Sequence, residues 1–362
     1  MIHPLHEKYA KLLTQACLRV EPGDNVSINL ETTAEVMARP VAREVLRAGG
    51  IPHLRMHYPA WTQDLLELAP EDYFEAEPTV ELREVQQMQA WLRIGGAANS
   101  RALQGADKSR LSRLAKRNRP VQNHRVNHTK WCGTLFPTQA GAQDAGMSLD
   151  DYERFVYDAM FLLDDDPVAK WAELEVYQAR VIDRLKEADE VRIVAAGTDL
   201  RMSVKGRTWI NSAAGHNMPS GEVFTGPVES SASGVITYAV PSAVNGVEVE
   251  GIRLSFENGR VVEARADKGD DLLQSQLSTD EGAKYLGELG VGTNYNIQLP
   301  TRSILFDEKI GGTVHLALGQ SYATTGGTNE SAIHWDMICD LRQGGAMYLD
   351  GELFQEGGQF KL

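Results

Sequence analysis

The chain has 362 residues, enough for one large domain or two domains of ordinary size. Hydrophobic residues make up 42% of it and charged residues 24%, an ordinary globular composition, and no apolar run approaches the ~18 residues of a membrane span. The net charge of -14 disfavours nucleic acid as a partner, because phosphate binding needs a basic surface.

The N-terminal region and the cysteines both favour a reducing cytoplasm. Residues 4–18 have the spacing of an amphipathic helix and lack the basic start and uninterrupted apolar stretch of a signal peptide. Cys17, Cys132 and Cys339 are far apart and form no CxxC pair, so they predict neither a disulfide framework nor a thiolate zinc site. We therefore expect a cytoplasmic protein with no membrane partner.

The first half of the chain alternates helix and strand patterns. The predicted strands are residues 25–30, 52–57 and 190–195. The predicted helices are residues 4–18, 33–47, 108–119, 149–162 and 168–187. Strands that alternate with helices of this length predict a mostly parallel sheet with helices on its faces. No GxGxxG motif follows the first strand, so dinucleotide binding has no support.

After about residue 200 glycine becomes frequent and short β-rich runs dominate. Asn258-Gly259 lies between two such runs and is a strong signal for a type I′ hairpin turn. One helix is expected, at about residues 270–289. The fold class is therefore α/β: an N-terminal α/β domain of residues 1–198 with a mostly parallel sheet, followed by a β-rich metal-binding domain of residues 199–362.

Carboxylates and histidines gather near glycines in this second domain. His334 and Asp336 are the sharpest pair, because residues i and i+2 of a strand point to the same face. Taken singly, each candidate has an ordinary structural explanation, such as a turn cap or a core histidine. Taken together, they form the mixed oxygen and nitrogen shell of a divalent metal site, suited to Zn, Co, Mn or Mg. The candidates are Glu222, Glu288, Glu308, His315, His334 and Asp336.

Six ligands exceed what one zinc ion needs, which indicates two ions ~3.5–4 Å apart.

Three other histidines are weaker candidates. His124 and His128 have a ligand spacing only on a helix, and Pro120 instead predicts extended chain there. His216 precedes Glu222 closely and is a minor candidate for the same site.

These motifs resemble those of the M29 family of metalloaminopeptidases, the aminopeptidase T and aminopeptidase S type, over most of the chain. Lys130–Phe155 looks like the family's middle segment. NMPSGEVFTGP around Glu222, LGELGVGTN around Glu288, the LFDE segment with His315, and the final HWD triplet look like its metal-binding blocks in order. Several separate blocks agree, so the match is specific.

The resemblance implies that the six candidates are the family's metal ligands, and that Tyr322 is a tyrosine lying against the metals. The spacing between Glu308 and His315 is wider than in the family. The stretch between Tyr322 and His334 is shorter than in the family, and because it is expected to line the substrate pocket, its length bears on which substrate is bound. The resemblance also implies a homodimer.

We expect hydrolysis of N-terminal residues from peptides by a water activated by two metals. A bound metal lowers the pKa of its water toward ~7, and a second metal polarises the carbonyl or anchors the α-amine of the substrate. Glu222 is the expected general base. Tyr322 is expected to donate a hydrogen bond to the developing oxyanion.

Three alternatives stay open at this point. Some ring-cleaving dioxygenases of hydroxylated pyridines resemble the family and hold one Fe(II), but Glu222, Glu288 and His315 together favour the hydrolase. A hydrolase of a small non-peptide amide would keep the same site, and the shortened stretch after Tyr322 permits it. A binding protein with a degenerate metal site is disfavoured, because every ligand type is present.

Overall fold

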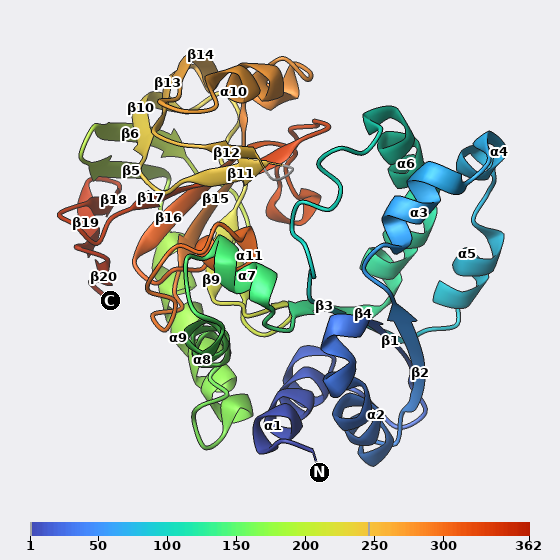
Figure 1. Ribbon diagram of the computed structural model, residues 1–362. Helices are drawn as coiled ribbons and strands as arrows, with labels where there is room; N and C mark the ends of the chain where they lie inside the picture. Colours follow the sequence, from blue (N-terminus) through green and yellow to red (C-terminus); the bar gives the residue numbers. More distant parts are fainter. Residues whose placement is uncertain (1, 245–246) are drawn as a thin grey trace. The chain divides into compact units, whose positions relative to one another are not determined.

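The computed structural model describes residues 2–244 and 247–362 (Figure 1). By internal contacts the chain forms two compact units, the first ending at Trp171 and the second beginning at Ala172. The segment Ala214–Pro219 returns to the first unit. This division lies earlier than the predicted boundary between residues 198 and 199, because α9 (Pro167–Leu185) and the hairpin that follows it supply side chains to the core of the second unit.

The first unit is built on a five-stranded parallel sheet in the order β2–β1–β3–β4–β8. The strands are β1 (Asn25–Glu31), β2 (Ile51–His57), β3 (Ala90–Gly95), β4 (Lys130–Leu135) and β8 (His216–Met218). The first four alternate with helices along the chain, which confirms the predicted α/β arrangement. The short strand β8 comes from the returning segment and pairs with β4.

Helices lie on both sides of this sheet, with α1 and α2 on one side and α3, α4 and α6 on the other (Figure 1). Side chains of β3 alternate accordingly: Leu92 and Ile94 are fully buried, whereas Trp91 and Arg93 point to the opposite face. The helices are α1 (Pro4–Leu12) with a π-helical turn (Leu13–Cys17), a 3-10 helix (Thr32–Met37), α2 (Ala38–Arg47), α3 (Trp61–Leu68), α4 (Glu71–Glu75), α5 (Thr79–Val85), α6 (Lys108–His128), α7 (Gln139–Asp144) and α8 (Leu149–Ala159).

Helix α6 is longer than predicted, since it continues through Pro120 to His128. The expected extended chain after Pro120 is therefore wrong. A proline removes one backbone hydrogen bond but does not end a helix whose neighbouring turns are supported by packing. Contacts of α6 with α4, α5 and β4 supply that support.

The second unit is a sandwich of an eight-stranded and a five-stranded sheet, in which the pairings are antiparallel. The first has the order β14–β13–β10–β6–β5–β18–β19–β20 and the second the order β17–β16–β15–β9–β7. The first comprises β5 (Glu190–Ala195), β6 (Thr198–Ser203), β10 (Ser233–Tyr238), β13 (Ile252–Glu257), β14 (Arg260–Arg265), β18 (Ala346–Leu349), β19 (Glu352–Glu356) and β20 (Gln359–Phe360). The second comprises β7 (Ile210–Ser212), β9 (Glu222–Thr225), β15 (Leu286–Gly292), β16 (Thr313–Gly319) and β17 (His334–Asp340), and β11 (Ser242–Val244) pairs with β12 (Val247–Val249) outside both.

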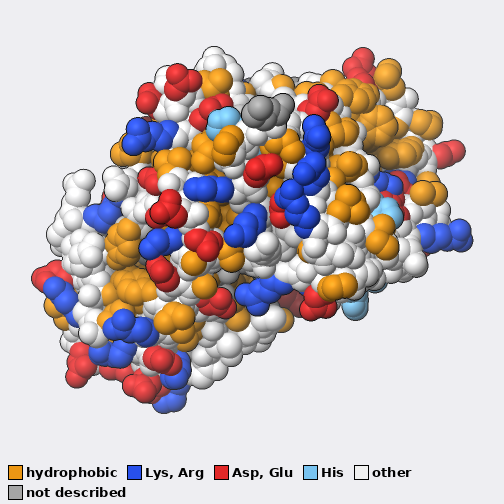
Figure 2. Space-filling view, turned by 90° about the horizontal axis from the view of Figure 1, so that it is seen from below, with side chains coloured by type: hydrophobic (Ala, Val, Ile, Leu, Met, Phe, Trp, Pro, Cys, Tyr) orange, Lys and Arg blue, Asp and Glu red, His pale blue; other side chains and the backbone are white. Residues whose placement is uncertain are grey.

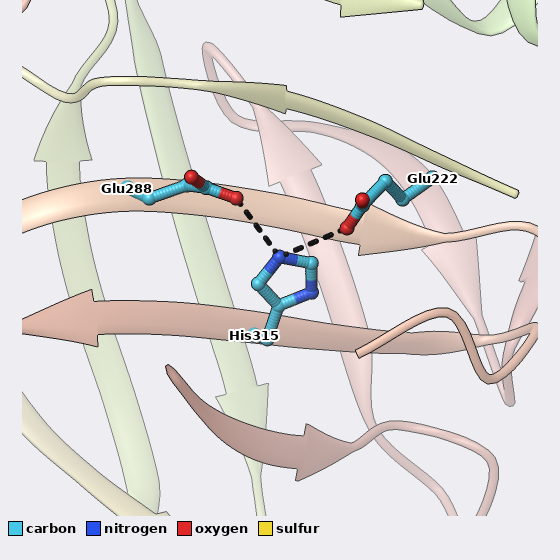
Figure 3. Close-up of side chains that lie close together, drawn as sticks. All are labelled: Glu222, Glu288 and His315. Atoms are coloured by element: carbon cyan, nitrogen blue, oxygen red, sulfur yellow. Dashed lines mark hydrogen bonds and ion pairs between the residues drawn. The ribbon is translucent and has the colours of Figure 1, made fainter. Parts of the chain in front are cut away.

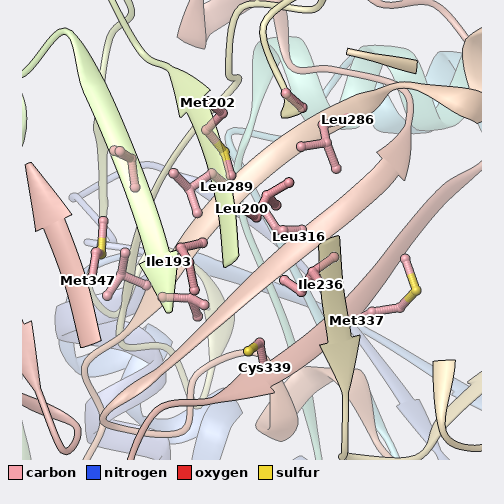
Figure 4. Packing of buried hydrophobic residues seen from close by; sticks show 14 of the residues in the cluster. Ile193, Leu200, Met202, Ile236, Leu286, Leu289, Leu316, Met337, Cys339 and Met347 are labelled. Atoms are coloured by element: carbon pink, nitrogen blue, oxygen red, sulfur yellow. The ribbon is translucent and has the colours of Figure 1, made fainter. Parts of the chain in front are cut away.

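The two sheets share one hydrophobic core (Figure 4). Ile193 and Leu200 from the larger sheet lie in one buried cluster with Leu289, Leu316 and Met337 from the smaller one. Because strand side chains alternate, the residues between these core positions point to the other face of the smaller sheet. That face carries the predicted ligands except Glu308, which follows the helix Ile304–Asp307.

Two local predictions of the second unit have different outcomes. Asn258 and Gly259 have φ of +50° and +82°, the positive values that a type I′ turn requires, so the hairpin is confirmed. The helix predicted at residues 270–289 is too long: α10 (Asp270–Leu277) stops early and β15 follows. The glycines of β15 disfavour a helix, and every residue of the strand is buried. The described part of the unit also has a short α-helix, α11 (Ile304–Asp307), and two 3-10 helices, Gly282–Lys284 and Ala323–Thr325.

Charged side chains of both signs are interspersed with hydrophobic ones on the face drawn in Figure 2, so the acidic excess forms no single patch there. The three cysteines are buried and unpaired. Among the residues that the structure describes, no helix is both long enough and apolar enough to cross a bilayer.

Candidate metal centre

Four adjacent strands of the smaller sheet present carboxylates and imidazoles on the face away from the core. Glu222 begins β9, Glu288 lies on β15, His315 on β16, and His334 and Asp336 on β17. Their neighbours Val223, Leu289, Leu316 and Trp335 point into the core instead. The antiparallel pairing of β9, β15, β16 and β17 thus brings residues far apart in the sequence to one surface.

Glu222 and Glu288 converge on the ring of His315 (Figure 3). His315 Nε2 lies 3.1 Å from Glu288 Oε1 and 3.3 Å from Glu222 Oε2. One ligand atom from each residue lies within 4.8 Å of the other two, an arrangement that can hold an ion. Gly290 makes room for the ring, because a Cβ there would stand 2.0 Å from His315 Nε2.

His334 and Asp336 extend this cluster from the neighbouring strand. His334 Nε2 lies 3.4 Å from Asp336 Oδ2 and 3.7 Å from Glu288 Oε2, so Glu288 contacts both imidazoles. His334 Nδ1 donates to the carbonyl of Gln320 at 2.8 Å, which leaves Nε2 as the ligand atom. The predicted same-face pair of His334 and Asp336 is therefore present in the structure.

Glu308 meets the cluster only indirectly. Its carboxylate contacts Lys309, and Lys309 Nζ lies 3.6 Å from Glu222 Oε1. In the described part of the chain Glu308 makes no ion pair with either histidine, unlike Glu222, Glu288 and Asp336. Lys309 is fully buried and was not identified from the sequence, where a lysine after two acidic residues looks like any surface lysine.

Burial and mutual repulsion shape the ionisation of these groups. Burial raises the pKa of Glu222 to about 7 and also raises that of Glu288. Burial lowers the pKa of His315, but its hydrogen bond to the Glu288 carboxylate and the Glu222 charge outweigh it and raise the value to about 9. For His334 the Asp336 contact likewise outweighs burial, and the pKa rises to about 10. Without a cation, the site therefore holds protons that balance its carboxylates.

The donor set fits a divalent ion. Three buried atoms of the candidate ligands have no hydrogen-bond partner in the described structure: Glu222 Oε2, His315 Nδ1 and Asp336 Oδ1. Buried polar atoms are nearly always paired, so unpaired carboxylate oxygens beside imidazoles indicate a missing partner. Carboxylate oxygen with imidazole nitrogen is a donor set that Zn, Co and Mn accept.

Tyr322 and a small cavity border the cluster. The ring of Tyr322 lies 5.3 Å from that of His334 and 5.7 Å from that of Phe224, and the residue is 50% exposed. Burial of its hydroxyl raises its pKa, so the hydroxyl remains a donor. A cavity of about 380 Å³ is lined by His334 and Asp336 together with Ser242, Arg302 and Asp307.

The three weaker histidine candidates lie in the first unit. The rings of His124 and His128 lie 4.6 Å apart on α6, and no carboxylate contact joins them among the described residues. His216 belongs to β8 and stacks on Trp131 with ring centroids 4.6 Å apart. None of the three belongs to the cluster of Glu222, Glu288 and His315.

Comparison with known proteins identifies the family. The family described as thermophilic metalloprotease (M29) matches residues 3–359. This chain belongs to the M29 family. Aminopeptidase 2 of Geobacillus stearothermophilus is 28% identical over an alignment of 381 residue positions, and the alignment covers 92% of this chain and 91% of that protein. Aminopeptidase T of Thermus thermophilus is 28% identical over 403 residues, covering 98% and 96%.

Solved structures agree with the M29 assignment. Wild-type AmpT from Thermus thermophilus superposes with a TM-score of 0.85 and 25% identity over 99% of both chains. A 2,5-dihydroxypyridine dioxygenase from Pseudomonas putida has a TM-score of 0.58 and 14% identity over 98% of this chain and 96% of that one, which shows a shared fold alone. The predicted family and enzyme class, a metal-dependent aminopeptidase, are confirmed, and the alternatives are not favoured.

Proposed function

We propose that this M29 metalloprotease removes N-terminal residues from peptides at a centre that holds two divalent ions. The observation that carries the proposal is the position of Glu288, whose two oxygens face different histidines. One oxygen belongs with His315 and Glu222, the other with His334 and Asp336. A single carboxylate that contacts both donor groups suits a pair of neighbouring ions.

The proposed ligands are Glu222, Glu288, Glu308, His315, His334 and Asp336. When bound there, Zn, Co, Mn or Mg ions supply a nucleophilic water at neutral pH and positive charge for the developing oxyanion. Glu308 is included because it shares Lys309 with Glu222, although its carboxylate stands apart from the histidines.

The remaining steps fall to side chains of this chain. Glu222 Oε2 is buried and has no hydrogen-bond partner, so it is the oxygen proposed to accept the proton of the attacking water. The Tyr322 hydroxyl is proposed to donate a hydrogen bond to the oxyanion. Lys309 holds the other oxygen of Glu222 and thereby fixes which oxygen is available.

The substrate is proposed to enter the cavity beside His334 and Asp336. Its volume of about 380 Å³ suits one or two residues and not a folded chain. Carboxylates around the cavity favour a free α-ammonium group, which an exopeptidase must recognise. A homodimer and a cytoplasmic location, both expected from the sequence, belong to the same proposal.

The test is release of p-nitroaniline from a panel of aminoacyl-p-nitroanilides by chelated enzyme, before and after addition of Zn, Co, Mn or Mg. We expect turnover only with metal, and no turnover of the N-acetylated form of the best substrate. Equal turnover of the acetylated and free compounds would contradict an aminopeptidase. Silence over the whole panel with metal bound would contradict the peptide substrate.

A further inference from the structure

The parallel sheet of the first unit has a topological switch point. From β1 the chain moves to β2 on one side and then to β3 on the other, so the connections leave in opposite directions. In open α/β sheets, ligands bind in the crevice at the carboxyl ends of the strands beside such a point. A cavity of about 300 Å³ lies at the ends of β1 and β2, where Glu31, His57 and Tyr58 line it.

A larger cavity of about 810 Å³ continues from it over the sheet face, and the two share Asn29, His57 and Arg93. We call the two together the tryptophan cavity, since Trp61, Trp91 and Trp131 line the larger part. These are three of the six tryptophans in the chain. All its lining residues belong to the first unit, and none of them is a candidate metal ligand.

Most of the arginines in the tryptophan cavity have carboxylate partners. Arg93 Nη2 lies 3.3 Å from Glu31, Arg117 Nη2 lies 3.1 Å from Glu81, and Arg55 pairs with Glu84. Arg117 also lies over the ring of Tyr73 at 4.4 Å. These three guanidinium groups are neutralised within the protein.

Arg125 differs from them. Its guanidinium lies 4.6 Å from the ring centre of Trp131, and no carboxylate among the described residues contacts it. Burial and the nearby charge of Arg93 lower its pKa. Trp131 Nε1 is also buried without an acceptor in the described structure. Arg125 thus presents to the cavity a cation that has no carboxylate partner in the described part of the chain.

We propose that the tryptophan cavity binds a small carboxylate that carries an aromatic ring. A guanidinium group recognises a carboxylate through two parallel hydrogen bonds, and Arg125 is free to form them. The indole rings of Trp61 and Trp91 offer flat apolar walls for the ring of the ligand. With one uncompensated cation, the site matches a monoanion better than a polyphosphate. The proposal does not depend on the aminopeptidase activity.

The probe is N-acetyl-phenylalanine, with its neutral amide as the matched ligand, and the readout is isothermal titration calorimetry on the metal-loaded enzyme. The blocked amine keeps both compounds from acting as substrates. We expect the carboxylate to bind about tenfold tighter than the amide or better. Arg125→Gln removes that preference, whereas Arg119→Gln, an exposed position on the same helix, retains it.

Equal binding of the acid and the amide, no binding of either, or an unchanged preference in Arg125→Gln would each overturn the proposal. Tighter binding of inorganic phosphate than of the acid would do so too. Phenylacetate and N-acetyl-Gly-Gly-Phe then distinguish the source: a preference for the first indicates a free aromatic acid, and a preference for the second indicates a peptide C-terminus. Trp131→Phe is a second variant. It is expected to weaken binding of N-acetyl-phenylalanine while the circular dichroism spectrum stays unchanged.

Discussion

The candidate metal centre and the tryptophan cavity balance charge in opposite ways. In the metal centre, Glu222, Glu288 and Asp336 outnumber Lys309, the buried lysine beside them, and these carboxylates raise the pKa of His315 and His334. In the tryptophan cavity each lining arginine except Arg125 has a carboxylate partner among the described residues. The net charge of -14 reveals neither imbalance. The sign of an expected ligand follows from the unpaired groups within a site and not from the charge of the whole chain.

Among the substitutions considered, replacement of Glu288 should have the largest effect on metal content and activity. Glu288→Gln keeps the shape but removes the charge shared by His315 and His334, so metal content should fall. Activity should drop at least ~10³-fold, because several kcal/mol of charge stabilisation are lost with the ions. Metal analysis and p-nitroanilide turnover measure both, and Glu257→Gln, an exposed change at the end of β13, is the control. Full metal content with full activity in Glu288→Gln would contradict the shared-ligand role.

Tyr322→Phe should leave the metals in place but slow turnover. Loss of one oxyanion donor typically lowers kcat by ~10²-fold or more. Metal content and KM should change little, because the ring still packs beside His334. Tyr348→Phe on β18 is the matched control. An unchanged kcat would rule out the proposed hydrogen bond.

Lys309→Met should act on stability in a way that depends on metal. Without metal, the change removes the buried cation that contacts Glu222 and the half-buried Glu308, and removal of one partner of a buried pair lowers the free energy of unfolding by about 3–5 kcal/mol. Bound ions should offset part of that loss. In thermal unfolding with and without chelator, the Tm of Lys309→Met should therefore rise more on metal addition than the Tm of the wild type. Lys205→Met, 70% exposed, should show no such difference.

The smallest expected effect is the pH dependence of the metal-free protein. The pKa values of His315 and His334, about 9 and about 10, lie above the ordinary 6.5. Their contribution to stability is therefore complete below about pH 6.5 and is lost as the pH rises through the folded values. Metal requires the unprotonated ligands, so its affinity should rise over the same range. The gap in Tm between loaded and chelated protein should widen with pH, and a gap that narrows would contradict this assignment.

The sequence predicted the parts of the fold and site that depend on local pattern. Alternation along a strand places His334 and Asp336 on one face, and Asn258-Gly259 predicts its hairpin turn. Register between distant strands is not local, and that register brings Glu222, Glu288 and His315 together. The residue types alone suggest a shared metal site, but which atoms meet there depends on that register.

Other features depend on tertiary contacts that no single pattern contains. Lys309 resembles a surface lysine until the fold buries it beside Glu222 and Glu308. Glu288 was expected at the end of a helix, but neighbouring strands draw it into β15. Arg125 differs from Arg117 on the same helix only because Glu81 reaches one and not the other. In each case, side chains or strands distant in the sequence determine the environment of the residue.

The proposal of two ions per chain can be tested by titration of chelated enzyme with Zn or Co, in which turnover of the preferred aminoacyl-p-nitroanilide and bound metal are followed together. We expect activity to become complete only at two equivalents per chain, and Glu288→Gln to show no such rise. Full activity at one equivalent, or activity independent of metal, would contradict it.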